Sequence, residues 1–361
     1  MSMQFPSGTN TYLPSFDATG QLVVSFSRNP KDFALNQYVT ITPVKKSSGY
    51  YLKLNAEQAA RVSHDDLKDH VWHDGNDAPH GEYNNEKFEW LNFNTTRYVF
   101  PFRLGYKAVD QADWKIVASY SAINAQQAMT ARTVRVLDKL LADSLDGHVV
   151  SMSDSSNPIT SSASVGLHEG EPGDSGSDVT KVALLKKAFN HAAKRIHKDT
   201  LGVVGPKDLV VLINPDMADA LSRSKEVHSY LKESPFALSQ VRGDSESQNG
   251  KWGLPDQLYG YKIIVEDTVR VRFKKGGSKS SSDPAYVLPS DQILMLARPG
   301  DLIGFEGSPS YSTVHLFAYE EMTVEQKDDP DNRRINARIV EDYGVEVVAP
   351  VSAFKFTNVL V

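Results

Sequence analysis

The sequence predicts an α+β fold, and three observations lead to that assignment. Apolar side chains recur at helical spacing over residues 119–143, which predicts one long amphipathic helix. Residues 209–213 are Leu-Val-Val-Leu-Ile, a continuous apolar run typical of a central strand buried on both faces. Residues 316–324 and 335–348 are strand-like and flank a polar turn, so we expect an antiparallel pair near the end of the chain.

Length and composition favour a soluble protein built from two or three compact units. The chain has 361 residues, of which 40% are hydrophobic and 23% are charged, as in ordinary globular proteins. Its 39 Lys and Arg residues against 45 Asp and Glu residues give a net charge of −6. This balance disfavours a protein whose main task is to grip nucleic-acid phosphates.

Features that the sequence lacks exclude further classes of protein. The chain contains no cysteine, which excludes disulfide frameworks, thiolate metal centres and cysteine nucleophiles. Its longest apolar runs are far shorter than the ~20 residues that a membrane-spanning helix needs. Residues 1–30 lack the basic start and apolar core of a secretory signal, so we expect a cytoplasmic protein with no membrane contact.

The first hundred residues predict extended structure that lacks a core of its own. Residues 1–45 hold isolated hydrophobic side chains among Ser, Thr, Asn and Pro, which indicates an extended arm that needs a partner surface. A frayed terminus is the alternative. Residues 87–104 are dense in aromatic and β-branched side chains and break at residues 92–94, which predicts a long two-stranded excursion.

Two helices are predicted in the middle of the chain. The first, over residues 119–143, is expected to bury one stripe of side chains: Ile123, Gln127, Thr130, Val134, Leu137 and Leu141. The second begins near residue 178, and its predicted apolar face consists of Val182, Leu185, Phe189, Ala192 and Ile196. Residues 151–178 are rich in Ser, Gly, Asp and Pro, which indicates a surface loop or a boundary between domains.

Further elements are predicted after the central strand at residues 209–213. Asn214 and Pro215 predict a helix start, because an Asn side chain accepts free N–H groups and Pro tolerates the first helical position. Residues 261–273 alternate as a strand does, and residues 276–283 form a Gly/Ser loop. Phe-Lys-Phe at residues 354–356 closes the chain as a strand.

Two segments contain residue types that catalysis uses. Four histidines, interleaved with five aspartates, have side chains that bind zinc, manganese or iron: His64, His70, His73 and His80. Gly-Asp-Ser-Gly at residues 173–176 matches the nucleophile segment of trypsin-like proteases, with Ser175 as the nucleophile. The histidines lack the spacing of a helical zinc pair, and the other triad members do not accompany Ser175. Exposed loops are therefore the favoured interpretation of both segments.

Two other segments carry a resemblance to a known family. In the first, a buried strand at 209–213 and an Asn-Pro helix start are followed by Gly-Lys-Trp-Gly-Leu-Pro at 250–255 and by Leu-Tyr-Gly-Tyr-Lys-Ile-Ile-Val-Glu-Asp at 258–267. In the second, residues 321–356, a strand, a charged turn and another strand follow one another. With these segments and this order of elements, the chain resembles the major capsid proteins of tailed bacteriophages, whose fold encapsulins share.

The resemblance implies a phage capsid-type fold in which the chain divides into four parts. Residues 1–45 would be an N-terminal arm, and residues 46–112 an extended loop built as a β-hairpin. Residues 113–144 and 311–361 would form a peripheral domain that includes a long spine helix. Residues 145–310 would form an α/β axial domain.

The resemblance also implies a structural, non-enzymatic function. The chain would be the major capsid (head) protein that self-assembles into pentamers and hexamers of an icosahedral shell around phage double-stranded DNA. It would be assembled in the host cytoplasm and located in the virion. The implied partners are further copies of the chain, a separate scaffolding protein, a portal, a decoration protein and DNA contacted non-specifically. No catalytic residue, cofactor or metal is implied, and the alternatives are an encapsulin-like compartment shell or a metal-dependent or serine hydrolase.

Four residues are predicted to lie at contacts between subunits. Trp90 and Phe93 belong to the aromatic excursion, which would bury its rings against a neighbouring subunit. Arg333 and Arg334 follow the turn at residues 328–332, which would project from the closing strands and meet its counterparts in other capsomers.

Overall fold

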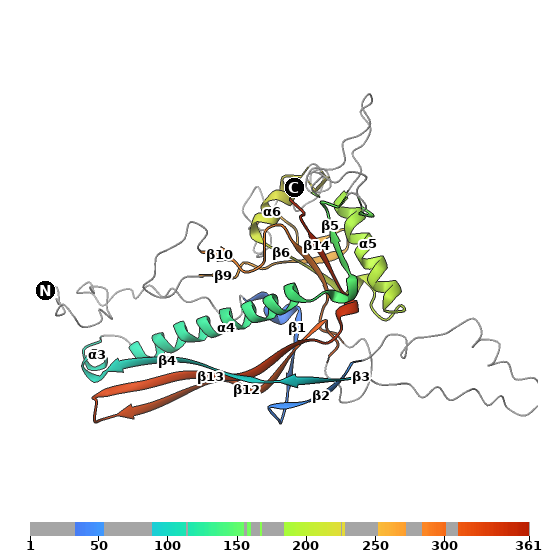
Figure 1. The fold of residues 1–361 in the computed structure, drawn as a ribbon. Helices are drawn as coiled ribbons and strands as arrows, with labels where there is room; N and C mark the ends of the chain where they lie inside the picture. The colour runs from blue at the N-terminus through green and yellow to red at the C-terminus, as the bar shows by residue number, and fades with distance from the viewer. Residues whose placement is uncertain are drawn as a thin grey trace, which may run out of the picture.

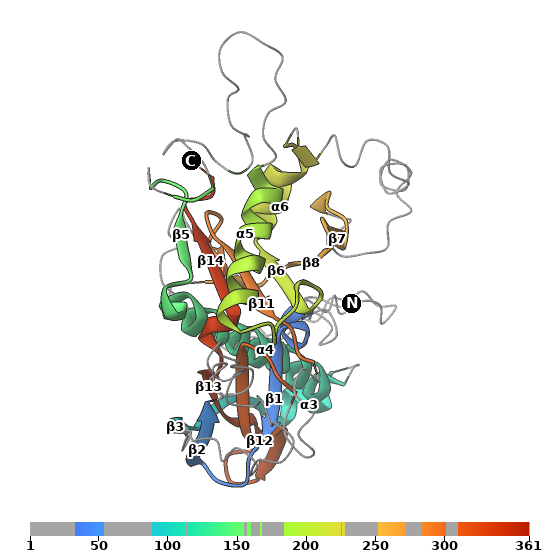
Figure 2. The same ribbon diagram turned by 90° about the vertical axis from the view of Figure 1, so that its right-hand side faces the viewer.

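The computed structural model describes residues 33–53, 89–112, 115–154, 157–159, 167, 184–224, 226–227, 252–271, 284–300 and 310–360. Within them, two sheets lie on either side of one long helix, α4 (Ile116–Ala142), as Figure 1 and Figure 2 show. One hydrophobic cluster joins α4 to both sheets, and a second cluster covers the far face of the larger sheet. The predicted α+β fold is therefore confirmed.

The long helix α4 has the predicted position, but its buried stripe differs from the predicted one. The buried side chains are Ile116, Asn124, Ala128, Met129, Thr133, Val136, Leu137 and Leu140. Gln127 is exposed, and Leu137 alone belongs to both stripes. Asn124 Nδ2 and Thr133 Oγ1 each donate to the backbone carbonyl four residues earlier, at 2.9 and 3.1 Å. Because the helix itself satisfies these polar groups, their burial costs little, and hydrophobicity alone does not identify them.

The smaller sheet has four strands in the order β1-β12-β13-β4. They are β1 (Val39–Pro43), β12 (Val314–Asp329), β13 (Arg334–Val347) and β4 (Thr96–Gly105). β12 and β13 form the predicted antiparallel pair, and a polar turn joins them as expected. The pairing of β1 with β12 ends at Ala318, and register shifts in β12 follow at once. Beyond that point residues 319–329, 334–343 and 96–105 continue as a three-stranded ribbon along α4, which we call the distal ribbon (Figure 1).

Residues 87–104 do not form the single two-stranded excursion that the sequence predicts. β3 (Glu89–Asn94) pairs with β2 (Ser48–Lys53), whereas β4 pairs with β13. The chain crosses β13 on its way from β3 to β4 at Gly344, where a Cβ atom would lie 2.3 Å from the Asn94 carbonyl oxygen. A residue without a side chain is needed at this crossing.

The larger sheet has six strands in the order β5-β14-β11-β6-β8-β7. They are β5 (Val149–Ser151), β14 (Ala353–Thr357), β11 (Ile293–Ala297), β6 (Leu209–Ile213), β8 (Tyr261–Val265) and β7 (Gln257–Leu258). In β6, Val211 faces the outer cluster, while Val210 and Leu212 face the cluster that contains α4. Both faces of this strand are buried, as its unbroken apolar run predicts.

Two helices lie on the outer face of the larger sheet (Figure 2): α5 (Leu184–Asp199) and α6 (Pro215–Ser222). α5 buries Leu185, Phe189, Ala192 and Ile196, which confirms its predicted face within the described residues. α6 begins as predicted, because Asn214 Oδ1 accepts the backbone N–H groups of the first turn.

Short elements complete the described chain: η2 (Ala34–Gln37), α3 (Tyr106–Asp110), η3 (Leu145–Gly147), η4 (Pro206–Asp208), β9 (Val269–Arg270), β10 (Ala285–Tyr286) and η6 (Pro350–Ser352). The strand predicted over residues 261–273 is therefore divided into β8 and β9.

Part of the segment expected as the N-terminal arm, residues 33–40, contributes buried side chains to the core of the described chain. Leu35 and Tyr38 of this segment are buried in the cluster that contains α4. The Tyr38 hydroxyl donates to Glu266 Oε2 at 3.0 Å. Burial raises the pKa of Glu266, and hydrogen bonds from Thr268 and Tyr38 oppose that change. Residues 1–32 of the predicted arm lie outside the described residues.

Two buried polar side chains connect the end of α4 to the larger sheet. Lys355 Nζ donates to the backbone carbonyls of Leu141 and Asp143, at 3.0 Å each. A cation is well placed at a helix C-terminus, where carbonyl groups have no partner within the helix. His148 Nε2 lies 2.8 Å from Asp199 Oδ2 at the end of α5. These contacts hold α4, α5 and β14 in one arrangement.

Candidate functional site

The pair β2 and β3 presents an aromatic surface to solvent. Tyr50 and Trp90 are 69% and 63% exposed, although aromatic side chains of this size usually contribute to cores and interfaces. On the opposite face, Tyr51 and Phe93 pack on Phe317 of β12, with ring centroids 5.4 and 4.6 Å apart. A two-stranded sheet is marginally stable alone, so packing on one face and association on the other both suit this pair.

Phe93 does not occupy the exposed position that the sequence prediction requires. Its side chain is 7% exposed and stacks on Phe317 within the same subunit. Alternate residues of a strand face opposite sides, so the spacing of three between Trp90 and Phe93 places them on opposite faces. Of these two residues, only Trp90 is exposed.

The turn that joins β12 to β13 is organised by one carboxylate. Asp329 Oδ1 accepts the Asn332 backbone N–H at 3.2 Å, and Asp329 Oδ2 accepts Arg334 Nε at 2.9 Å. Hydrogen bonds from Asn332, followed by the Arg334 guanidinium, hold the pKa of Asp329 below its usual range. Arg334 therefore serves the turn itself, whereas Arg333 is exposed at the tip with φ of 48°.

The outer face of the distal ribbon is lined with cross-strand ion pairs. Arg338 Nε lies 2.5 Å from Glu325 Oε2, and these residues are direct partners across β13 and β12. Arg97 on β4 lies 3.5 Å from Asp342 and 3.8 Å from Glu320. The arginine of each pair is more than half exposed, and surface pairs of this kind contribute under about 1 kcal/mol each. They therefore fix strand register more than stability.

The opposite face of the ribbon is joined to α4 by a buried charged network. Glu341 is fully buried, and its Oε2 lies 2.8 Å from Arg132 Nη2. Arg135 Nη1 donates to the Tyr343 hydroxyl at 2.5 Å and packs its guanidinium 3.5 Å from the centroid of the Tyr98 ring. Burial raises the pKa of Glu341, and Arg132 opposes that change. A buried carboxylate is tolerable only with such partners, so the network requires α4 and β13 to stay together.

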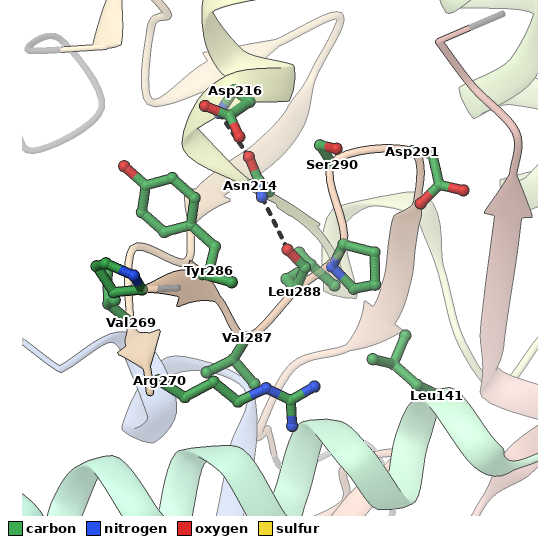
Figure 3. A pocket seen from close by; sticks show the side chains of 13 residues that line it. Leu141, Asn214, Asp216, Val269, Arg270, Tyr286, Val287, Leu288, Ser290 and Asp291 are labelled. Atoms are coloured by element: carbon green, nitrogen blue, oxygen red, sulfur yellow. Dashed lines mark hydrogen bonds between the residues drawn. The ribbon is translucent and has the colours of Figure 1, made fainter. Parts of the chain in front are cut away.

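A cavity of about 540 Å³ lies beside the start of α6 (Figure 3). Two of its polar side chains, Asn214 and Arg270, are used for structure. Asn214 Nδ2 donates to the Leu288 carbonyl at 2.8 Å, and Arg270 Nη1 donates to both carboxylate oxygens of Asp138, at 3.0 and 3.2 Å. Burial, followed by the charges of Asp216 and Asp267, raises the pKa of the Tyr286 hydroxyl. The first contact joins the start of α6 to the segment at Leu288, and the second joins β9 to α4. Neither contact pairs a nucleophile with a base.

The two segments with catalytic residue types lie outside the described residues. They are residues 64–80, with four histidines, and residues 173–176, with Ser175. In the part of the chain that the structure describes, no group of three or more His, Asp and Glu side chains is placed to hold a metal ion. No helix in that part is long and apolar enough to cross a bilayer.

Sequence reasoning missed Tyr50 and the network around Glu341. Tyr50 lies in a segment that the sequence predicts as extended. Its neighbour Tyr51 is covered by Phe317 of β12, which is distant in sequence, so the exposed face of this strand cannot be identified locally. Glu341 lies in the apolar run Ile-Val-Glu-Asp-Tyr, and a carboxylate within such a run indicates a buried ion pair. Its arginine partners are more than 200 residues away, so the sequence does not identify them.

Comparisons with known proteins identify the fold. No protein-family model and no curated protein matches the sequence. A phage-related protein from Bordetella bronchiseptica RB50 is 9% identical, with a TM-score of 0.55 over 92% of this chain and 94% of that chain. The mature capsid of bacteriophage PhiM1 is 10% identical, with a TM-score of 0.52 over 96% of this chain and 91% of that chain. The capsid of cyanophage P-SCSP1u is 12% identical, with a TM-score of 0.51 over 96% and 92%.

The chain is therefore similar in fold to phage capsid proteins along almost its whole length. This confirms the predicted capsid-type fold. The low identities explain why the resemblance is confined to short segments of sequence.

Proposed function

We propose that the chain is a major capsid protein that self-assembles into the pentamers and hexamers of an icosahedral phage head enclosing double-stranded DNA. The observation that carries this proposal is the capsid fold, which extends over more than nine-tenths of this chain and of the chains it resembles. A fold alone hosts many functions, so the proposal also needs surfaces suited to assembly.

The exposed aromatic face of β2 and β3 is such a surface. Tyr50 and Trp90 lie on the side of this sheet that faces away from Phe317. Burying two such rings stabilises a contact by several kcal/mol at about 25 cal/mol per Å² of apolar area. A neighbouring copy of the chain is the partner that supplies this burial in a shell.

The four-part division of the chain belongs to the same proposal. α4 would be the spine helix, with the smaller sheet as its peripheral domain and the larger sheet as the axial domain. The exposed Arg333 at the tip of the β12–β13 turn would contact its counterparts where capsomers join. We carry Trp90 and Arg333 forward as contact residues, and not Phe93 or Arg334.

The proposal includes partners and a location. A separate scaffolding protein, a portal and a decoration protein would act with the subunit, which would assemble in the host cytoplasm and remain in the virion. The net charge of −6 suits a container whose wall does not bind a packaged polyanion tightly.

Size-exclusion chromatography of the full chain, expressed with and without the scaffolding protein, tests the proposal. We expect capsomers or megadalton particles, and particles from a productive infection should protect double-stranded DNA from nuclease. A strict monomer at high concentration with scaffold supplied would count against a shell protein of any kind. Shells that hold protein cargo and no protected DNA would favour the encapsulin-like alternative.

A further inference from the structure

The distal ribbon has two long edges with no neighbouring strand among the described residues. β1 pairs with β12 only as far as Ala318, so residues 320–329 form one open edge. β4 is the last strand on the other side of the sheet, and its residues 96–105 form the second open edge. Open strand edges are surfaces that another chain readily contacts.

The two edges carry opposite charge. The β12 edge contains one lysine, Lys327, and five carboxylates: Glu320, Glu321, Glu325, Asp328 and Asp329. The β4 edge contains Arg97 and Arg103 and no acidic residue. The strand between them, β13, contributes arginines and acids in equal number over residues 334–343: Arg334, Arg338, Glu341 and Asp342. The ribbon is therefore acidic on one side and basic on the other.

Part of this charge is neutralised within the subunit, and part is not. Arg97 pairs with Glu320 and Asp342. Among the described residues, neither Arg103 on β4 nor Glu321 on β12 has an ion-pair partner. An apolar side chain is also exposed on each edge, since Val99 on β4 is 43% exposed and Val324 on β12 is 56% exposed. Each edge thus combines unpaired charge of one sign with apolar surface.

Pro101 bears on whether the β4 edge can pair with another strand through its backbone. Proline has no backbone N–H, and it lies in the middle of β4. Proline in an edge strand opposes continuation of the hydrogen-bonded ladder by a neighbouring chain. We therefore expect a partner at the β4 edge to be bound mainly through side chains.

We propose that the basic β4 edge of one copy lies against the acidic β12 edge of the next copy, head to tail. The occupant of each edge is thus a second copy of this chain, because the chain itself supplies the complementary charge. Since two different surfaces meet, the contact is heterologous, and a contact of this kind forms a ring when its rotation closes. The inference rests on the proposed shell function and names one contact within it. Charges arranged in this way orient neighbours more than they add affinity.

The absence of cysteine from the chain makes a direct test straightforward. Val99→Cys places a thiol on the β4 edge, and Thr323→Cys places one on the β12 edge; both residues are exposed and flank Val340 in one row. The two single variants would be mixed, assembled and treated with a short bismaleimide that joins two thiols. We expect a cross-linked dimer in the mixture and at least tenfold less in either variant alone.

Controls separate this contact from random collision. Val149→Cys, an exposed position on the larger sheet, mixed with Thr323→Cys should give no dimer above the single variants. Arg103→Glu in the Val99→Cys chain should lower the dimer yield at least tenfold at low salt, whereas Arg103→Lys should preserve it. Loss with Glu and retention with Lys would assign the effect to charge and not to folding.

The outcomes also separate this inference from the proposed function. Shells of normal size with no dimer in the mixture would overturn the edge contact and leave the shell function intact. Dimers formed by Val99→Cys alone would show like edges meeting, which also overturns it. A parent chain that never assembles would overturn both proposals.

Discussion

Gly344 is the residue where the structure leaves the least room for substitution. An added Cβ would meet the Asn94 carbonyl oxygen at 2.3 Å and the Asn94 carbonyl carbon at 3.1 Å, and both atoms belong to the backbone. We expect Gly344→Ala to destabilise the subunit by about 2 kcal/mol or more, because backbone cannot yield as a flexible side chain does. The thermal midpoint of the unassembled subunit measures this effect. Gly105→Ala, where nothing lies within 4 Å of the added atom, is the matched control, and equal midpoints for the two variants would contradict the account.

His315 links stability to pH. It is buried on β12, where Thr42 Oγ1 lies 3.1 Å from its Nδ1, and burial lowers its pKa from 6.5 to about 4. The unfolded chain therefore binds a proton at a higher pH than the folded one does. The folded state is therefore favoured while His315 is neutral in both states, above pH 6.5, and this stability is lost as the pH falls from 6.5 toward 4. At 1.36 kcal/mol per pKa unit, the complete loss is about 3 kcal/mol.

Replacing His315 tests this linkage. We expect His315→Asn to lose less stability than the parent between pH 7 and pH 5, measured by urea denaturation of the unassembled subunit. Identical losses in the parent and in His315→Asn would show that this group does not carry the effect.

At the scale of single elements, α4 offers the clearest test of which helix face is buried. Leu137 is fully buried between α4 and both sheets, whereas Gln127, on the same predicted stripe, is exposed. We expect Leu137→Asp to abolish soluble expression, because burying an unpaired carboxylate costs several kcal/mol. Gln127→Asp should be soluble, with a change of about 0.5 kcal/mol from helix propensity. Equal solubility of the two variants would show that the buried face of α4 is wrongly assigned.

Individual elements were largely predictable, because each depends on neighbouring residues. Helix α4, strand β6 and the Asn214 cap of α6 all lie where local patterns indicate. The buried stripe of α4 was not predictable from hydrophobicity, since Asn124 and Thr133 are buried through hydrogen bonds to the helix itself. Local pattern therefore predicts the position of an element better than its orientation.

At the scale of the whole molecule, strand partners were the main feature that the sequence did not reveal. β4 pairs with β13, more than 200 residues away, and β1 pairs with β12 across a similar interval. No local pattern records such partners, so residues 33–43 resembled an arm and residues 96–105 half of a hairpin. Partners that are distant in sequence also decide which aromatic residues of the candidate site are exposed. Trp90 is exposed on its strand, and its predicted contact with a neighbouring subunit stays a prediction, whereas the partner of Phe93 is Phe317, which lies 224 residues later.

The aromatic surface makes a prediction about assembly. We expect Trp90→Ser with Tyr50→Ser to leave the subunit folded, because both side chains are more than half exposed. The variant should accumulate as subunits or small oligomers under conditions in which the parent forms particles. The control is Val269→Ser, which removes an exposed apolar side chain from β9, and this variant should assemble normally. Sedimentation velocity distinguishes these outcomes, and parent-like particles from the double variant would remove the aromatic surface from the account.

The central claim is that this chain builds a closed shell from copies of itself. Negative-stain electron microscopy of the purified full chain, assembled with its scaffolding protein, tests that claim most directly. The account predicts uniform closed particles whose surfaces show five-fold and six-fold capsomers. A field of separate subunits, or of irregular aggregates with no closed particle, would contradict it.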